Sequence, residues 1–149
     1  MWVVLGSSGQ LGRCLMTELT SRNIEFLGLD RAQCDITSIA ALREVLHSAA
    51  PEVVVNCAAW TAVDQAEDHE YEAEAVNRDG PLNVAVVCSE IGSVLVQVST
   101  DYVFEGISST PMNEDAECRP VTVYGRTKLE GEMAALKNHS ARTYVVRTA

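Results

Sequence analysis

The sequence predicts an α/β fold in which helices cover a parallel sheet in a doubly wound arrangement. Short apolar runs rich in valine and leucine alternate with segments of helical periodicity from one end of the chain to the other. The first apolar run also leads through a glycine-rich turn directly into the first helical segment. Because strands that alternate with helices form right-handed βαβ units, this order of elements favours a single parallel sheet.

The N-terminal part of the chain predicts three strands and two helices. We expect strands at residues 2–5, 24–29 and 53–55, and helices at residues 10–20 and 35–46. In the first helix, Leu11, Leu15 and Leu19 recur at the spacing of one helical face. Capping side chains at residues 35–38 introduce the second helix.

The C-terminal part predicts two further strands and two longer helices. We expect strands at residues 94–98 and 144–146 and helices at residues 71–91 and 123–136, after a helical stretch that breaks near His69. The inner face of the helix at 71–91 should consist of Ala75, Leu82, Val86 and Val87. Gly92 follows that helix, as a C-terminal glycine should, and residues 106–120 read as a loop.

Composition excludes several classes of function. The formal net charge of -10 argues against a nucleic-acid partner, because such partners require clustered Lys and Arg. The five cysteines form no C-x-x-C pair, so we expect reduced thiols and neither a disulfide framework nor a metal site. The apolar runs are too short to cross a membrane, which predicts a cytoplasmic protein with no membrane partner.

The glycine-rich turn is the first candidate site. Gly6, Gly9 and Gly12 follow the first strand and open the first helix, with Gln10 and Leu11 between them. Such a turn needs residues without side chains where the backbone approaches a pyrophosphate, and the helix N-terminus attracts the phosphates. The strand before it and the helix after it are the context that a dinucleotide site requires.

Residues at the end of the second strand bear on the choice of nicotinamide cofactor. Asp30 can accept hydrogen bonds from the adenosine ribose, whereas Arg31 can pair with the 2′-phosphate of NADPH. A solvated surface role for Arg31 fits the sequence equally well. Asp35 is expected either near the adenine or as a helix cap. NADPH is the expected cofactor, and NADH stays open.

A tyrosine, a lysine and a threonine form the expected catalytic group. Tyr124 and Lys128 lie four residues apart on one face of a predicted helix. A nearby ammonium should lower the pKa of the phenol toward the working range, so that Tyr124 can protonate a carbonyl oxygen. Thr100 ends the fourth predicted strand, at the edge of the sheet where ligands bind, and can hydrogen-bond the same oxygen.

Four segments resemble the dTDP-4-dehydrorhamnose reductases, a family of extended short-chain dehydrogenases. They are residues 9–12 (GQLG), 56–64 (NCAAWTAVD), 99–104 (STDYVF) and 123–132 (VYGRTKLEGE). The resemblance covers the whole chain, and STDYVF is its most specific part. It implies a Rossmann domain that uses NADPH, often NADH as well, to reduce the C4 keto group of a nucleotide sugar, dTDP-4-dehydro-L-rhamnose.

The resemblance also implies residue roles. Thr100, Tyr124 and Lys128 would be catalytic, and Tyr124 and Lys128 would also hold the cofactor. Further cofactor contacts would come from Ala58, Ala59 and Thr61, and contacts to the nicotinamide or sugar from Val63, Asp101 and Tyr102. Plain packing explains Ala59 and Val63 about as well.

Two departures from the family are visible. Cys14 stands where members commonly carry an acidic residue linked to magnesium at a dimer interface, which argues against magnesium and leaves a homodimer open. The chain also stops directly after its fifth expected strand. We therefore expect residues 1–149 to be an incomplete dinucleotide-binding domain, truncated after that strand, with the substrate-binding portion outside this chain.

Two other interpretations stay open. An extended short-chain epimerase uses the same tyrosine and lysine, although the residues after Thr100 favour a reductase. A dehydratase would place glutamate at position 102, where this chain has Tyr102. A non-catalytic subunit resembling the regulatory subunit of methionine adenosyltransferase is the alternative from another class, and the intact catalytic group argues against it.

Overall fold

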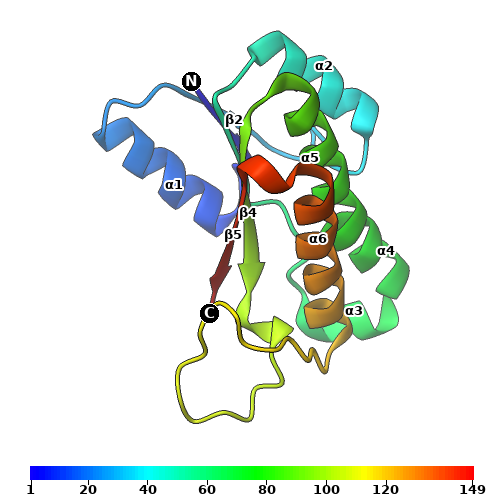
Figure 1. Cartoon of the computed structure of the whole chain (residues 1–149). Coiled ribbons are helices and arrows are strands. Elements are labelled where there is room, and N and C mark those ends of the chain that lie inside the picture. The colour runs from blue at the N-terminus through cyan, green and yellow to red at the C-terminus, as the bar shows by residue number, and fades with distance from the viewer.

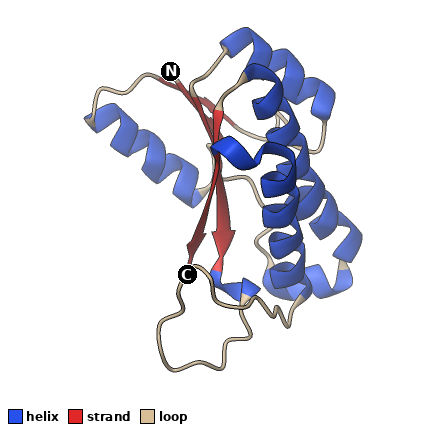
Figure 2. Ribbon diagram, in the orientation of Figure 1, coloured by secondary structure: helices blue, strands red, loops and turns tan.

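The computed structural model describes residues 1–149 as one parallel sheet with helices on both faces (Figures 1 and 2). The five strands are β1 (Trp2–Leu5), β2 (Phe26–Leu29), β3 (Val53–Asn56), β4 (Val94–Thr100) and β5 (Thr143–Thr148). They lie in the order β2-β1-β3-β4-β5 and every neighbouring pair is parallel. The predicted fold class is therefore confirmed.

The helices are distributed unevenly over the two faces of the sheet. They are α1 (Gln10–Ser21), α2 (Ile39–Ala49), α3 (Val63–Asp68), α4 (Glu70–Glu74), α5 (Gly80–Ile91) and α6 (Val123–His139). Helix α1 lies alone on one face, whereas α2, α5 and α6 cover the other (Figure 1). No helix combines the length and hydropathy that a membrane crossing needs.

The main core lies between the sheet and the layer formed by α2 and α5. Its fully buried side chains include Val3, Leu5, Val54 and Leu95 from the strands, and Leu42, Leu46, Val84 and Val87 from the helices. Burial of these aliphatic side chains is the main stabilising contribution to the fold. The core fixes the strands, and the carboxyl ends of the strands form the edge that carries the candidate site.

The helix expected at residues 71–91 differs most from its prediction. It is built from α4, a π-helical turn η1 (Ala75–Asp79) and α5. The expected inner face was wrong in part: Val87 is buried, but Ala75, Leu82 and Val86 are only half-buried. A π turn adds a residue to one turn of the helix, so the buried stripe changes phase there and a single helical period cannot describe it.

Other boundaries move by a few residues for local reasons. Helix α2 starts at Ile39 because the Ser38 hydroxyl accepts a hydrogen bond from the backbone N–H of Ala41. Helix α5 ends at Gly92, which has a φ of +72° and confirms the expected C-terminal glycine. The loop that follows β4 begins with a short 3₁₀ turn, η2 (Asp101–Val103).

Candidate active site

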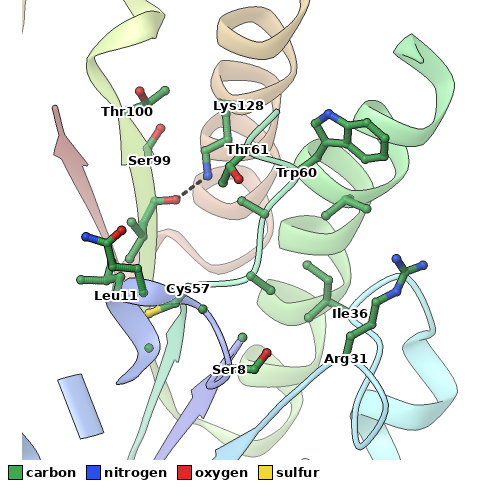
Figure 3. A pocket seen from close by; sticks show the side chains of 18 of the residues that line it. Ser8, Leu11, Arg31, Ile36, Cys57, Trp60, Thr61, Ser99, Thr100 and Lys128 are labelled. Carbon is green, nitrogen blue, oxygen red and sulfur yellow. Dashed lines mark hydrogen bonds between the residues drawn. The ribbon is translucent and has the colours of Figure 1, made fainter. Parts of the chain in front are cut away.

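A crevice of about 750 Å³ opens at the carboxyl edge of the sheet. The ends of β1, β3 and β4 form its floor, and the N-terminal turn of α1 and one face of α6 form its walls (Figure 3). In an open α/β sheet this edge is where ligands bind. The crevice is therefore the place to look for the residues that the sequence singled out.

The glycine turn is held tightly against the loop that follows β3. Gly6 has a φ of +76°, and a Cβ atom on it would lie 2.6 Å from the backbone nitrogen of Ala58. A Cβ atom on Gly12 would collide with the carbonyl oxygen of Gly6. A side chain at either position would push α1 or the β3 loop away, so the close approach of the two requires glycine.

Helix α1 directs its N-terminus into this crevice. Gly9 is its N-cap and contributes no side-chain acceptor, and the backbone N–H of Arg13 bonds the Gly9 carbonyl. The N–H groups of the first turn therefore have no acceptor from a capping side chain. Free N–H groups and the positive end of a helix dipole are the features that suit the binding of phosphate groups. Gly9, Gln10 and Leu11 all line the crevice.

Of the three residues expected near the adenosine, two line the crevice and one does not. Arg31 and Asp35 line the crevice, and the Arg31 Nε donates to an Asp35 carboxylate oxygen at 3.2 Å. Burial alone would raise the pKa of Asp35, but hydrogen bonds from Thr37 and Arg31 outweigh it and hold that pKa below its ordinary value. Asp35 does not cap α2, because Ser38 does.

Asp30 does not line the crevice in this structure, and its contact with the adenosine ribose stays a prediction. Its carboxylate accepts a hydrogen bond from the backbone N–H of Gln33 at 3.0 Å, and the Gln33 side chain accepts from the backbone N–H of Asp30. This reciprocal pair closes the turn after β2. In this structure the acidic side chain is engaged in turn formation, which the spacing from the glycine turn could not reveal.

The three predicted catalytic residues line the crevice together. The Thr100 hydroxyl accepts from the backbone N–H of Tyr102 and donates to a carboxylate oxygen of Asp101, both at 3.2 Å. Helix α6 starts when the Thr122 hydroxyl accepts from the N–H of Gly125, which places Tyr124 in its first turn. Lys128 follows one turn later, on the same face.

Lys128 is buried and anchored to the sheet. Its side chain crosses to β4, where the ammonium donates to the carbonyl oxygen of Val98 at 2.7 Å (Figure 3). Burial lowers the pKa of Lys128 from its ordinary value of 10.5 to about 8, although the carboxylate of Glu132 acts in the opposite direction. The amine is therefore still mainly protonated at neutral pH.

The expected lowering of the Tyr124 pKa was wrong. Burial raises the pKa of Tyr124 above its ordinary value, a hydrogen bond with Thr100 lowers it in part, and the Asp101 carboxylate raises it further. Lys128, whose ammonium donates to Val98, is not among these causes. Tyr124 is thus a neutral phenol at neutral pH, the protonation state that a proton donor must have.

Comparison with known proteins shows the family to which this chain belongs. A protein-family model described as the RmlD substrate binding domain matches residues 1–149. The chain belongs to the RmlD family. It is 49% identical over 148 residues to a dTDP-4-dehydrorhamnose reductase of Streptomyces griseus, covering 99% of this chain and 49% of that protein.

Solved structures agree with this membership. The dTDP-4-dehydrorhamnose reductase of Clostridium acetobutylicum is 40% identical, with a TM-score of 0.95 over 99% of this chain and 52% of that one. The Bacillus anthracis enzyme, solved in complex with NADP, is 35% identical, with a TM-score of 0.94 over 98% of this chain and 52% of that one. This member of the RmlD family thus spans about half the length of these relatives.

The three residues expected to contact nicotinamide or sugar lie at the rim of the RmlD crevice or beyond it. The Tyr102 ring meets the Tyr124 ring edge-on, with centroids 5.5 Å apart at 76°. Asp101 lines a neighbouring hollow of about 550 Å³ that the loop after η2 encloses. Val63 does not line the crevice but packs against the small apolar cluster that contains Ala66, Ala73 and Tyr124.

Several lining residues of this RmlD domain escaped the sequence analysis. They include Ser8, Cys34, Ile36, Cys57, Trp60, Val76, Val98 and Ser99. Burial raises the pKa of the Cys57 thiol to about 11, so this thiol stays neutral. Ser99 is buried, and its hydroxyl has no hydrogen-bond partner in the chain. Its place in the STDYVF segment, directly before Thr100, was the signal in the sequence that could have identified it.

Trp60 is held by a buried amide on the π-helical turn. The Asn77 side chain accepts from the Trp60 backbone N–H at 2.9 Å and donates to the Trp60 carbonyl at 3.1 Å. It also donates to the Thr127 hydroxyl, next to Lys128 in the chain. The π turn thus ties the β3 loop to α6 beside the candidate catalytic residues, and π turns are frequent at functional sites.

Proposed function

We propose that this chain carries the nicotinamide-cofactor site and the proton donor of a reductase. Its reaction would be the reduction of the C4 keto group of dTDP-4-dehydro-L-rhamnose to the alcohol of dTDP-L-rhamnose. One observation carries the proposal: Thr100, Tyr124 and Lys128 line the same crevice as the glycine turn. The name of the Streptomyces griseus relative and the NADP bound to the Bacillus anthracis enzyme support the substrate and the cofactor.

The crevice offers fitting groups for each part of a dinucleotide. The glycine turn and the N-terminus of α1 would hold the pyrophosphate, since only backbone is present where phosphates approach. Arg31 would pair with the 2′-phosphate of NADPH, and Asp35 would lie beside the adenine. Ala58, Ala59 and Thr61 would line the middle of the site, with Tyr124 and Lys128 at the nicotinamide ribose.

The reduced nicotinamide would supply a hydride to the ketone carbon. Tyr124 would give its phenolic proton to the carbonyl oxygen as negative charge develops there, and Thr100 would hydrogen-bond the same oxygen. The neutral state of Tyr124 at physiological pH suits this direction of transfer. The hydrogen bond from Thr100, which lowers the pKa of Tyr124, would then stabilise the tyrosinate that remains, and the Lys128 ammonium would hold the nicotinamide ribose. The ketone thus gains a hydride and a proton, and becomes an alcohol.

Three further assignments belong to this proposal. Residues 1–149 would act as one dinucleotide-binding domain, because the crevice draws its walls from both halves of the chain. NADPH would be preferred over NADH through Arg31. Magnesium would play no part, since Cys14 is an exposed thiol on α1 at the position where a carboxylate would be required.

Cofactor binding and proton donation can be tested separately. Calorimetric titration of the chain with NADPH and with NADH should show saturable binding, and binding of neither would refute the dinucleotide site. In a full-length protein that includes the substrate-binding portion, Tyr124→Phe should then lower the turnover of the keto sugar by about 100-fold or more, with NADPH affinity nearly unchanged. Tyr144→Phe is the matched control, because Tyr144 is exposed on β5. Equal, measurable turnover by the full-length Tyr124→Phe variant and the full-length parent would exclude Tyr124 as the acid.

A further inference from the structure

Two side-chain amides are buried at the centre of the sheet, directly below the candidate active site. Asn56 ends β3, Gln97 lies on β4, and the two are opposite each other in the parallel register. Their exposed fractions are 0% and 1%. Neighbouring positions on these strands, Val54 and Leu95, carry aliphatic side chains in the main core. Burial of amides at such positions costs free energy unless every polar atom finds a partner.

The amides form a continuous chain of hydrogen bonds. The backbone N–H of Ala58 donates to the Asn56 side-chain oxygen at 3.1 Å, and the Asn56 amide nitrogen donates to the Gln97 side-chain oxygen at 2.9 Å. The Gln97 amide nitrogen then donates to the carbonyl oxygen of Val98 at 2.9 Å. This carbonyl is also the acceptor for the Lys128 ammonium, at 2.7 Å.

The direction of this chain of hydrogen bonds follows from its first member. A backbone N–H can only donate, so Ala58 requires an oxygen from Asn56 and leaves the Asn56 nitrogen to face Gln97. Gln97 must then present its oxygen to Asn56 and its nitrogen to Val98. A flip of either amide would place two donors or two acceptors face to face. The amides therefore have one arrangement in which all of these bonds form.

We propose that Gln97 is a positioning residue that, with Asn56, orients the Val98 carbonyl so that it holds Lys128 in the crevice. A carbonyl oxygen has two lone pairs, and here Gln97 occupies one and the lysine the other. Gln97 thereby limits rotation of the Val98 peptide and fixes the point to which the ammonium is tied. The network also joins Lys128 on one wall to Ala58 on the other. The inference rests on the proposed function only in treating Lys128 as part of the cofactor site.

The composition of the chain makes this anchoring directly measurable. Lys128 and Lys137 are the only two lysines, and Lys137 is exposed on α6. In a chain labelled with ¹⁵N at lysine, the Nζ–H signal of Lys128 should show slow exchange with water, whereas that of Lys137 should be fast. Gln97→Met keeps the volume but removes the amide, and should speed exchange at Lys128 by about tenfold. Lys137 is the internal control.

A matched variant separates positioning from general loosening. Ser93→Ala also removes a buried hydrogen bond from a side chain to the backbone, that of Ser93 to the Pro51 carbonyl, at the other end of the sheet. It should leave exchange at Lys128 unchanged. If Gln97→Met does not fold because it leaves the Asn56 amide unpaired, the double variant Asn56→Leu/Gln97→Met removes that group as well and should show the same faster exchange. Unchanged exchange in the folded variant, or an equal effect of Ser93→Ala, would overturn the proposal.

Cofactor affinity provides an independent readout. Gln97→Met should weaken NADPH binding by about tenfold in the parent chain, yet have little further effect in a Lys128→Met background, because its influence passes through the lysine. If the losses of NADPH affinity caused by Gln97→Met and Lys128→Met simply add in the double variant, Gln97 does not act through the lysine. If the parent chain binds no NADPH, the proposed function fails, while the exchange experiment still decides whether Gln97 positions Lys128.

Discussion

Replacement of Lys128 by methionine should make the chain more stable while it removes function. Lys128 is only 5% exposed, and burial brings its pKa from 10.5 to about 8. This lowering of the pKa corresponds to about 3 kcal/mol of unfolding free energy, which the folded state loses because it keeps the amine charged at neutral pH. Methionine has a similar length and no charge, so it avoids this cost, but it forfeits the hydrogen bond from the charged ammonium to Val98, worth about 2 kcal/mol. We expect a net gain of about 1 kcal/mol at pH 7.

The gain should depend on pH in a defined direction. The folded-state pKa of Lys128 lies below the unfolded-state value, so between pH 8 and pH 10.5 the unfolded chain binds more protons than the folded one. The parent chain therefore regains stability relative to Lys128→Met as pH rises through this window. The difference in unfolding free energy between Lys128→Met and the parent chain should be largest below pH 8 and should shrink toward pH 10.5. All other titrating groups are the same in the two chains, so they do not contribute to this difference.

Urea unfolding at several values between pH 6.5 and pH 10 would measure this difference. Lys137→Met is the control, because Lys137 is exposed on the same helix and its replacement should change stability by less than about 0.5 kcal/mol at every pH. The same Lys128→Met chain should lose NADPH affinity. If Lys128→Met is less stable than the parent chain at pH 7, or if the difference does not vary with pH, the assignment of a costly buried ammonium is wrong.

Three further substitutions test other parts of the structure. Gly12→Ala should weaken NADPH binding at least tenfold and destabilise the chain by about 2 kcal/mol in urea, because its methyl group would collide with the Gly6 carbonyl; unchanged calorimetric affinity would contradict the tight glycine turn. Arg31→Ala should lower NADPH affinity about tenfold and leave NADH affinity nearly unchanged, and equal losses for both would exclude a 2′-phosphate contact. Glu132→Leu should lower unfolding free energy by about 2–3 kcal/mol, because it leaves the Arg147 guanidinium without its paired carboxylate oxygen at 2.7 Å. Replacement of both residues by apolar side chains should restore most of that loss, and failure to do so would show that the pair acts through packing.

The fold and most of the lining residues could be predicted because their signals are local. A buried parallel strand is a short apolar run, and the glycine turn needs its residues at fixed spacing between a strand and a helix. Tyr124 and Lys128 share a face because they lie four residues apart on one helix. Thr100 joins them because parallel strands end at one edge of the sheet. Each of these inferences depends on neighbours in the chain or on the handedness of βαβ units.

Other features depend on contacts and a change of helical period that the sequence does not reveal. The contact of Asp30 with the ribose stays a prediction, and in this structure its carboxylate accepts from the backbone N–H of Gln33. The contact of Val63 with the nicotinamide or sugar also stays a prediction, and here Val63 packs against the cluster of Ala66, Ala73 and Tyr124. The inner face predicted for the helix at residues 71–91 was wrong in part, because a π turn shifts the phase of the buried positions along the helix. None of these arrangements follows from periodicity or from a motif.

The sequence by itself determined the parallel α/β architecture, the glycine turn and the order of the catalytic residues, since these depend on periodicity, glycine geometry and chain direction. Only the tertiary structure decided the protonation of the site. Burial of the phenol raises the pKa of Tyr124 where spacing alone predicted a fall, and the Lys128 ammonium donates to Val98. The supporting amides, Asn56 and Gln97, are 41 residues apart and meet only when β3 and β4 pair. Desolvation and long-range pairing arise from packing, and no local pattern in the chain records them.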